Sequence, residues 1–259
     1  MKNTLALLLL WCTGLLQAFG QQGVTNTSIL LVPFQPEFYL SDAERDIMAQ
    51  THQTPDAYRQ YFRRVLDLKI QAELEDLGPC HSLLQDTTTA GRSRLENFYA
   101  RVAYSYAHPV GPRRTADHDK RKEGKASGLH PDPHTAPQSI STRGDARFMQ
   151  AEIRDTAWLR QLCELHQAEW IVAINQFEIK TNYNSCIDIA NKIYRRELLI
   201  HYSILKADGR QYRGNFLMDF FPSGSNRDTE IAERVFPVLA KSLKEEVKDV
   251  AGISEKERK

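Results

Sequence analysis

The chain lacks an apolar run of the roughly 20 residues that a membrane-spanning helix needs. It also lacks an excess of one charge, since 34 Lys and Arg stand against 33 Asp and Glu. Glycine-rich phosphate loops of the Walker and dinucleotide-binding types are absent, and so is a Gly-x-Ser-x-Gly elbow. These absences argue against a membrane-spanning segment in the mature chain, nucleic-acid binding, nucleotide-dependent chemistry and an α/β-hydrolase site.

Cysteine is scarce, with 4 in 259 residues. Cys12 lies in the amino-terminal apolar segment, where the bulky Trp11 before it argues against lipoprotein processing. The remaining Cys80, Cys163 and Cys186 are an odd number, so they permit at most one internal disulfide. Their spacing matches no zinc pattern, and we expect three small buried apolar residues. The sequence predicts no metal and no cofactor, and it leaves the pairing of the three thiols open.

The amino terminus has the pattern of a secretory signal peptide. Lys2 supplies the positive charge, an apolar run of about seven residues follows over 5–11, and Ala18-Phe19-Gly20 places small residues at the cleavage positions. Such a run is too short to span a bilayer. We therefore predict a signal peptide over 1–20, cleaved after Gly20, and a soluble mature protein that is periplasmic or secreted.

Strand and helix signals alternate in the first half of the mature chain. The unbroken apolar run 29–34 predicts a strand that is covered on both faces. Thr54 and Pro55 are typical of a helix start, and Gly78-Pro79 of a helix end, which predicts a helix over about 55–77. After a polar stretch that ends at Arg94, a short helix and an extended piece are expected up to Tyr106.

Residues 107–144 interrupt the apolar periodicity. They are rich in proline and small polar residues and offer almost no side chain for a core. We predict a disordered insertion that divides one α/β domain into a first part, 21–106, and a second part, 145–250. His130 and His134 flank Pro-Asp-Pro inside the insertion, where the prolines oppose wrapping around a metal ion. A charged tail follows over 251–259.

In the second part, order resumes near 145–149, and a helix capped by Asp155 or Thr156 then runs to His166. A buried strand is expected from Trp170 through Ile179. Alternating patterns over 196–205 and 212–220, joined by Asp208-Gly209, predict a β-hairpin. The last helix starts near Asp228, and Pro237 should kink or restart it. The expected fold class is therefore α/β with a mixed sheet that contains an antiparallel hairpin and is packed by helices.

An acidic group follows the first strand and offers the one enzyme-like pattern. Asp42, Glu44 and Asp46, with His52, could hold a divalent metal ion for hydrolysis. Ser41 and Glu44 also fit a capping box at a helix start, which is the interpretation we favour. A metal-dependent hydrolase is thus an alternative, and a catalytic pair of Cys163 and His166 is disfavoured against simple packing.

The aromatic side chains after the first strand suggest a binding surface instead. Phe34, Phe38, Tyr39 and Asp42 lie in one loop, and exposed aromatic side chains often anchor a protein partner. The competing interpretation is that the aromatics close the core. A second alternative is a glycan or small-ligand binder with a pocket lined by aromatic side chains, namely Trp158, Trp170 or Tyr183.

Two segments resemble a known group of proteins. The stretch 29–46 and the stretch Gly144-Asp145-Ala146-Arg147-Phe148-Met149 are similar to a family of exported Gram-negative bacterial proteins without an assigned activity. The element order more loosely resembles the α/β modules of the TolB amino-terminal domain and the curli-secretion lipoprotein. That resemblance implies envelope assembly through protein contacts, and it carries over no catalytic residue. The absence of an evident pore-forming hairpin and of a lipid-ready cysteine argues against pore formation.

Taken together, the sequence favours a non-enzymatic periplasmic interaction or envelope-assembly module. Its expected partner is another envelope protein, bound through the loop 34–46. The partner's identity and the oligomeric state are left open.

Overall fold

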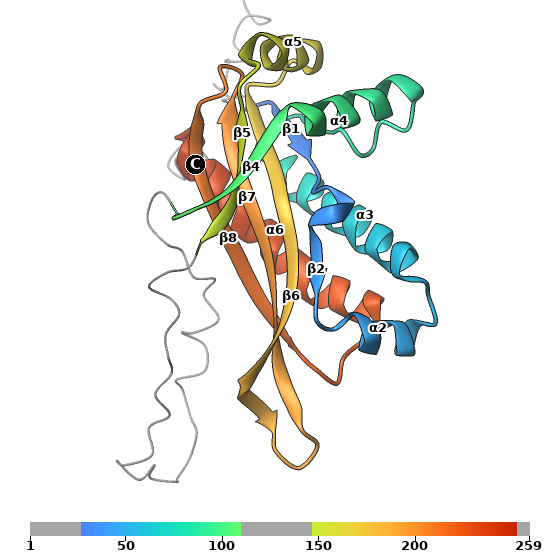
Figure 1. Ribbon diagram of the computed structural model, residues 1–259. Helices are drawn as coiled ribbons and strands as arrows, with labels where there is room; N and C mark the ends of the chain where they lie inside the picture. Colours follow the sequence, from blue (N-terminus) through green and yellow to red (C-terminus); the bar gives the residue numbers. More distant parts are fainter. Residues whose placement is uncertain (1–26, 110–146, 253–259) are drawn as a thin grey trace, which may run out of the picture.

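The computed structural model describes residues 27–109 and 147–252. Within these ranges the chain forms a mixed six-stranded sheet, a separate two-stranded sheet, and helices on both faces of the large sheet (Figure 1). The predicted mixed α/β fold is confirmed. The predicted signal peptide 1–20, nearly all of the predicted insertion 107–144 and most of the tail 251–259 lie outside the described residues.

The large sheet is built around one long strand, β6 (Trp170–Asp188). One edge of β6 pairs in parallel with β1 (Ile29–Val32) and, further along, with β2 (Tyr39–Ser41). Strand β1 pairs in parallel with β3 (Cys80–Ser82). The other edge pairs antiparallel with β7 (Ile193–Lys206), which pairs with β8 (Gln211–Pro222). The expected hairpin is thus β7–β8, with Gly209 at a φ of 79° in its turn.

Two long helices, α3 (Pro55–Leu74) and α6 (Asp228–Ala251), cover one face of the sheet. Thr54 caps α3 as predicted, because its side chain accepts a hydrogen bond from the Ala57 N–H. The helix ends three residues before the predicted 77. Helix α6 continues through Pro237, so the predicted restart does not occur. Both helices bury an apolar stripe in the larger of two cores.

Helices α4 (Thr89–Arg101) and α5 (Thr156–His166) pack against the opposite face and form a smaller core. Helix α4 begins before the predicted position because Thr88 caps it, accepting a hydrogen bond from the Gly91 N–H. Asp155 caps α5 as predicted. Two short helical segments, η1 (Pro36–Phe38) and α2 (Glu44–Thr51), flank β2. No helix in the two described ranges combines the length and apolar character needed to span a membrane.

The two-stranded sheet, β4 (Val102–Ala107) and β5 (Phe148–Ile153), lies on the same face as α4 and α5 (Figure 1). Buried polar side chains of the large sheet attach it. His201 Nδ1 accepts a hydrogen bond from the Met149 N–H at 2.8 Å, and Ser203 Oγ accepts one from the Ala151 N–H at 3.1 Å. Asn175 donates to the Met149 carbonyl at 2.8 Å. These bonds satisfy backbone groups of β5 that would otherwise be buried without a partner.

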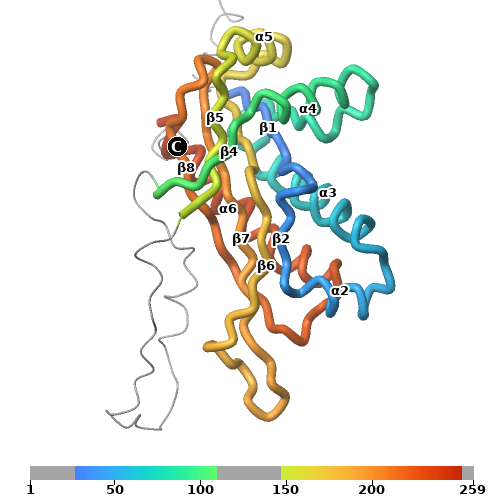
Figure 2. Tube along the Cα trace, in the orientation of Figure 1, coloured from blue at the N-terminus to red at the C-terminus, as the bar shows by residue number. Residues whose placement is uncertain are grey.

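Strands β6 and β7 continue beyond the body of the molecule as a two-stranded ribbon (Figures 1 and 2). Pairing with β2 ends at Ile179, and pairing with β8 ends at Arg195. Beyond these points the described residues place no other strand beside residues 182–193, which we call the tip ribbon. The sequence predicted β6 only as far as Ile179, so the ribbon is a feature that only the structure reveals.

Candidate functional site

The predicted acidic group does not converge on a common point. Asp42 accepts hydrogen bonds from the Thr181 N–H at 2.7 Å and the Thr181 hydroxyl at 3.0 Å. Glu44 accepts bonds from the Tyr58 hydroxyl and the Arg59 guanidinium, which hold its pKa below the ordinary value although burial opposes this shift. Because these carboxylates are already satisfied by protein donors, the loop offers no set of free metal ligands.

Asp46 and His52 are the other two residues of the predicted acidic group. Asp46 forms an ion pair with Arg196, and His52 is exposed at the carboxyl end of α2 with a φ of 54°. Within residues 27–109 and 147–252, no cluster of three His, Cys, Asp or Glu side chains could hold a metal ion. The predicted capping box is wrong, because Ala43 is the N-cap of α2 and Glu44 turns to α3. Ser41 instead accepts a hydrogen bond from the Ala43 N–H.

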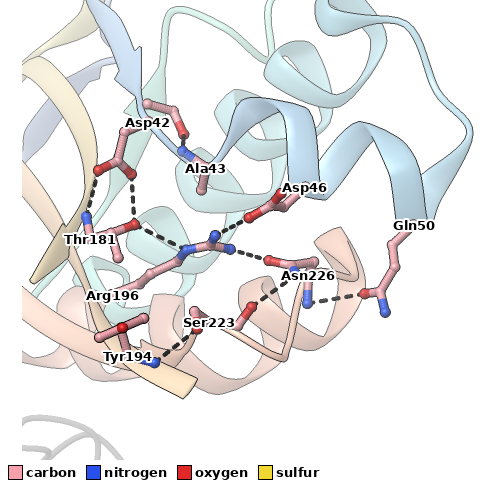
Figure 3. A network of polar contacts seen from close by, with 10 residues as sticks. Asp42, Ala43, Asp46, Gln50, Thr181, Tyr194, Arg196, Ser223 and Asn226 are labelled. Carbon is pink, nitrogen blue, oxygen red and sulfur yellow. Dashed lines mark hydrogen bonds and ion pairs between the residues drawn. The ribbon is translucent and has the colours of Figure 1, made fainter. Parts of the chain in front are cut away.

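Arg196 is the centre of the polar network that includes these residues (Figure 3). Its buried guanidinium donates to Thr181 Oγ1 at 3.3 Å and contacts Asn226 and Asp46. The backbone N–H of Asn226 donates a hydrogen bond to Gln50 Oε1 at 3.1 Å. Strands β6 and β7, helix α2 and the segment before α6 are therefore joined at one place, which is the base of the tip ribbon.

We expect Arg196→Met to lower the free energy of unfolding by about 2 kcal/mol, because hydrogen bonds to charged groups contribute roughly 1.5–3 kcal/mol net. Asp46 is half-exposed and can regain water, which limits the loss. Arg195→Met is the matched control, since this neighbour instead stacks on Phe220 with its guanidinium 4.0 Å from the ring centroid. Urea unfolding of both variants measures the difference. Equal effects at 195 and 196 would contradict a clamping role for Arg196.

The predicted partner loop divides into core and surface residues. Phe34 and Tyr39 are buried and stack on Phe177, with ring centroids 5.5 and 5.2 Å away. Phe38 is half-buried against Tyr104 at 4.8 Å. Asp42 is exposed but bonded to Thr181. Of the four residues, Phe38 and Asp42 alone can meet a partner without disturbing the core, and partner binding by this loop stays a prediction.

The tip ribbon carries more exposed large hydrophobic side chains than any other short segment of the described chain. Ile189 is 85% exposed, Tyr183 70% and Ile187 50%. These are three of the eight large hydrophobic side chains that are exposed in the described ranges. Asp188 shapes the turn by accepting hydrogen bonds from the Asn191 N–H at 3.1 Å and its amide at 2.7 Å. The available sequence signal for this ribbon was the presence of Tyr183, Ile187 and Ile189, which are residue types that favour strands.

A shallow hollow of about 190 Å³ lies between α4 and α5. It is lined by Arg94 and Asn97 of α4 and by Trp158, Gln161, Leu162 and Leu165 of α5. Trp170 and Tyr183, the other aromatic candidates for a ligand pocket, lie elsewhere. Trp170 is buried against Tyr212 at 5.1 Å, and Tyr183 packs on Tyr194 in the tip ribbon at 5.3 Å. No shared aromatic pocket therefore joins the three residues.

The three described cysteines are free thiols. Cys80 and Cys163 are buried as predicted, and burial raises the pKa of Cys80 to about 12 and of Cys163 to about 11. A thiol with such a pKa is protonated at neutral pH and is a poor nucleophile, which opposes catalysis by Cys163 with His166. Cys186 is exposed on the tip ribbon, so the expectation that all three are buried is wrong for this residue.

Comparison of the sequence with models of known protein families and with curated proteins finds no match.

Proposed function

We propose that this protein is a non-enzymatic interaction module that binds a protein partner through its tip ribbon. The observation that carries the proposal is the exposure of Ile189, Tyr183 and Ile187 at the end of a ribbon that projects from the body (Figure 1). Exposed apolar and aromatic side chains gathered in one projecting segment are typical of interaction sites, where their burial supplies binding energy.

The chemistry of the ribbon favours a protein partner over the interior of a lipid bilayer. Its outer edges carry backbone N–H and C=O groups beside which the described residues place no strand. Such groups are costly in hydrocarbon but can be satisfied by a protein surface. The charged Asp188 and Lys192 near the turn add to that cost.

The clamp at Arg196 supports this role because it fixes the base of the ribbon to α2 and to the segment before α6. A binding element held in one direction loses less conformational freedom when it meets its partner. We further propose that the protein acts in the cell envelope after export, on the strength of the amino-terminal signal pattern.

The alternative functions find less support. A metal-dependent hydrolase at Asp42, Glu44, Asp46 and His52 is disfavoured because the three carboxylates already have protein partners. Asp42 bonds to Thr181, Glu44 to Tyr58 and Arg59, and Asp46 to Arg196. For a glycan or small-ligand binder, the candidate pocket is the hollow beside Trp158. This hollow is small and open for a site of that kind.

The test is affinity capture from the host's envelope fraction with tagged wild-type protein and with a ribbon variant, Tyr183→Ser, Ile187→Ser and Ile189→Ser. We expect the ribbon variant to recover its main partner at least tenfold less efficiently, because the loss of three apolar anchors weakens binding by well over 1.4 kcal/mol. Thermal unfolding should be nearly unchanged, since the substituted side chains lie on the surface.

Leu68→Ser is the matched control, because Leu68 is exposed on α3 and lies outside both the ribbon and the loop 34–46. It should capture the partner as the wild type does. Equal capture by the ribbon variant and the control would rule out the proposed function. Tyr39 is unsuited to such a test, since its truncation removes a core side chain.

A further inference from the structure

Strands β4 and β5 are attached to the large sheet through side chains and not through a backbone ladder. In the two described ranges their strand pairing is with each other alone. His201 Nδ1 and Ser203 Oγ accept hydrogen bonds from backbone N–H groups of β5, and Asn175 donates one to a β5 carbonyl. Detachment of the β4–β5 pair therefore breaks no backbone pairing within the large sheet.

The apolar attachment of this pair comes mainly from β5. Phe148 is fully buried, and its ring packs over Gly214 of β8, where a Cβ atom would lie 2.5 Å from the ring. Ala151 and Ile153 are buried as well, whereas β4 buries no side chain to this degree. A two-stranded unit with one buried strand belongs to the parts of a fold that open most readily. Its few polar bonds to the sheet are then a large share of its attachment.

His201 is the one titratable group among the three side chains that hold β5. Its Nδ1 accepts the Met149 N–H at 2.8 Å, so the ring is neutral and carries its proton on Nε2. A second proton binds at Nδ1 and turns this atom from an acceptor into a donor. Two N–H groups then face each other and the hydrogen bond is lost. Ser203 and Asn175 do not titrate, so acid acts on this row of bonds through His201.

Glu178 of β6 is the carboxylate that faces the ring within the described residues. Its Oε1 lies 3.8 Å from His201 Nε2, which is beyond hydrogen-bond distance. The same carboxylate accepts a hydrogen bond from Gln176 at 2.6 Å and forms an ion pair with Lys180. Glu178 therefore offers a protonated His201 only part of its charge, and Lys180 opposes the charged ring.

The other elements packed against His201 bring no further charge to the ring in the part of the chain that the structure describes. Tyr106 of β4 meets it edge to face at 6.4 Å, and the Tyr106 hydroxyl donates to Gln176 at 2.8 Å. Phe216 of β8 lies 6.0 Å away, and β5 contributes the Met149 backbone. A charged His201 thus loses its partner on β5 and gains little in return while the strands stay attached.

We propose that the β4–β5 pair is an acid-released element of the fold. Protonation of His201 at Nδ1 breaks its bond to Met149, and the two strands then separate from the large sheet, which stays folded. Release uncovers the apolar side chains of β5, including Phe148, and the polar side chains of β6 and β7 that held its backbone. The inference concerns a different part of the molecule from the tip ribbon and does not depend on the proposed function.

The pH range follows from the two environments of the ring. Burial lowers the pKa of His201 from 6.5 to about 4 while the pair is attached, and contact with water restores about the ordinary value on release. The released form therefore binds the proton more tightly. Release is favoured as the pH falls below about 6.5, and the gain levels off near pH 4. The equilibrium constant for release should rise on the order of 100-fold between about pH 7 and pH 4.

Native-state amide hydrogen exchange, measured by NMR, tests the release. We expect the Met149 and Ala151 amides to open about 100-fold more often at pH 4 than at pH 7, after correction for the intrinsic exchange rate. Low urea should leave this opening nearly unchanged, because a local release exposes little surface. Amides that join β6 to β7 should open far more rarely and in a urea-dependent way. Identical opening and urea dependence in both sets at pH 4 overturns the inference, as does a β5 opening that is the same at both pH values.

Two substitutions separate the titration from the loss of a bond. His201→Gln keeps an acceptor for the Met149 N–H but does not titrate, so β5 opening should change by less than about threefold between pH 7 and pH 4. Ser203→Ala is the matched control, because it removes the acceptor of the Ala151 N–H on the same strand. It should raise β5 opening at both pH values and keep the roughly 100-fold pH dependence.

His201→Asn, whose amide oxygen takes about the place of Nδ1, replaces the glutamine variant if that variant does not fold. A pH dependence of wild-type size in the folded His201 variant contradicts the switch. Loss of the pH dependence in Ser203→Ala does so too, because that variant retains the imidazole.

Discussion

Replacing Phe177 with alanine is expected to lower the free energy of unfolding by about 4 kcal/mol, in line with buried Phe→Ala changes that cost roughly 3–5 kcal/mol. Phe177 is fully buried on the central strand β6, between α3 and α6. Its ring stacks on Phe34, Tyr39 and Phe62 at centroid distances of 5.5, 5.2 and 5.8 Å. Phe236 of α6 meets it edge to face at 6.1 Å.

The loss is large because these neighbours come from four separate segments of the chain and cannot all move into the space that the ring leaves. A cavity then adds to the lost transfer free energy. The matched control is Tyr183→Ala, which truncates an aromatic side chain on the same strand where it is exposed. Urea unfolding should show a change below about 1 kcal/mol for that control. Comparable losses at 177 and 183 would contradict this description of the core.

His201 is expected to make the fold less stable as the pH falls from about 6.5 to about 4. Burial lowers the pKa of His201 from 6.5 to about 4, and the nearby Glu178 offsets this only in part. The neutral ring is also the form that Nδ1 needs in order to accept the Met149 N–H. Below pH 6.5 the unfolded chain therefore binds a proton that the folded chain does not, and stability is lost until the folded ring also protonates near pH 4.

The size of this effect follows from the pKa difference. One pKa unit corresponds to about 1.4 kcal/mol, so the contribution of His201 is on the order of 3 kcal/mol between pH 6.5 and 4. Tyr106, Glu178 and Lys180 surround the ring, and Glu178 Oε1 lies 3.8 Å from Nε2. Glu178 is in turn paired with Lys180, which weakens its attraction for a protonated His201.

The measurement is urea unfolding of wild type and His201→Gln at several pH values. Glutamine keeps an acceptor for the Met149 N–H but does not titrate, so the variant should lose less stability between pH 6.5 and 4. His81→Gln, at an exposed position, is the control and should follow the wild type. The ring protons of His201 should titrate near pH 4 by NMR. An unchanged pH dependence in His201→Gln would show that the imidazole is already charged in the fold.

Local signals in the sequence predicted most of the elements. Thr54-Pro55 and Asp155 mark helix starts that the structure confirms, because capping is decided by residues three positions apart. Asp208-Gly209 predicted the β7–β8 turn for the same reason, since the left-handed conformation of Gly209 is a local requirement. The smaller core was less evident, because α4 contributes Leu95 and Phe98 as buried apolar side chains and Tyr99 only as a partly buried one.

The partners of the candidate-site residues could not be predicted from the sequence. Asp42, Glu44 and Asp46 are close in sequence and looked like one acidic group. In the fold they face partners up to 150 positions away, such as Arg196. For a related reason the sequence left open whether the aromatic loop closes the core. Tyr39 is covered by Phe177 and Tyr58, which belong to other elements.

The sequence by itself determined the alternation of strands and helices, the caps and turns, and the mixed α/β class, because periodicity and capping act over a few residues. Only the tertiary structure decided that β6 and β7 extend beyond the strands paired with them and expose Ile187 and Ile189 at one end of the molecule. It also decided that α4 and α5 leave a hollow at the other end. Exposure depends on which distant segments cover a residue. Strand pairing and helix packing settle that coverage, and the same isoleucines in a longer sheet would belong to its core.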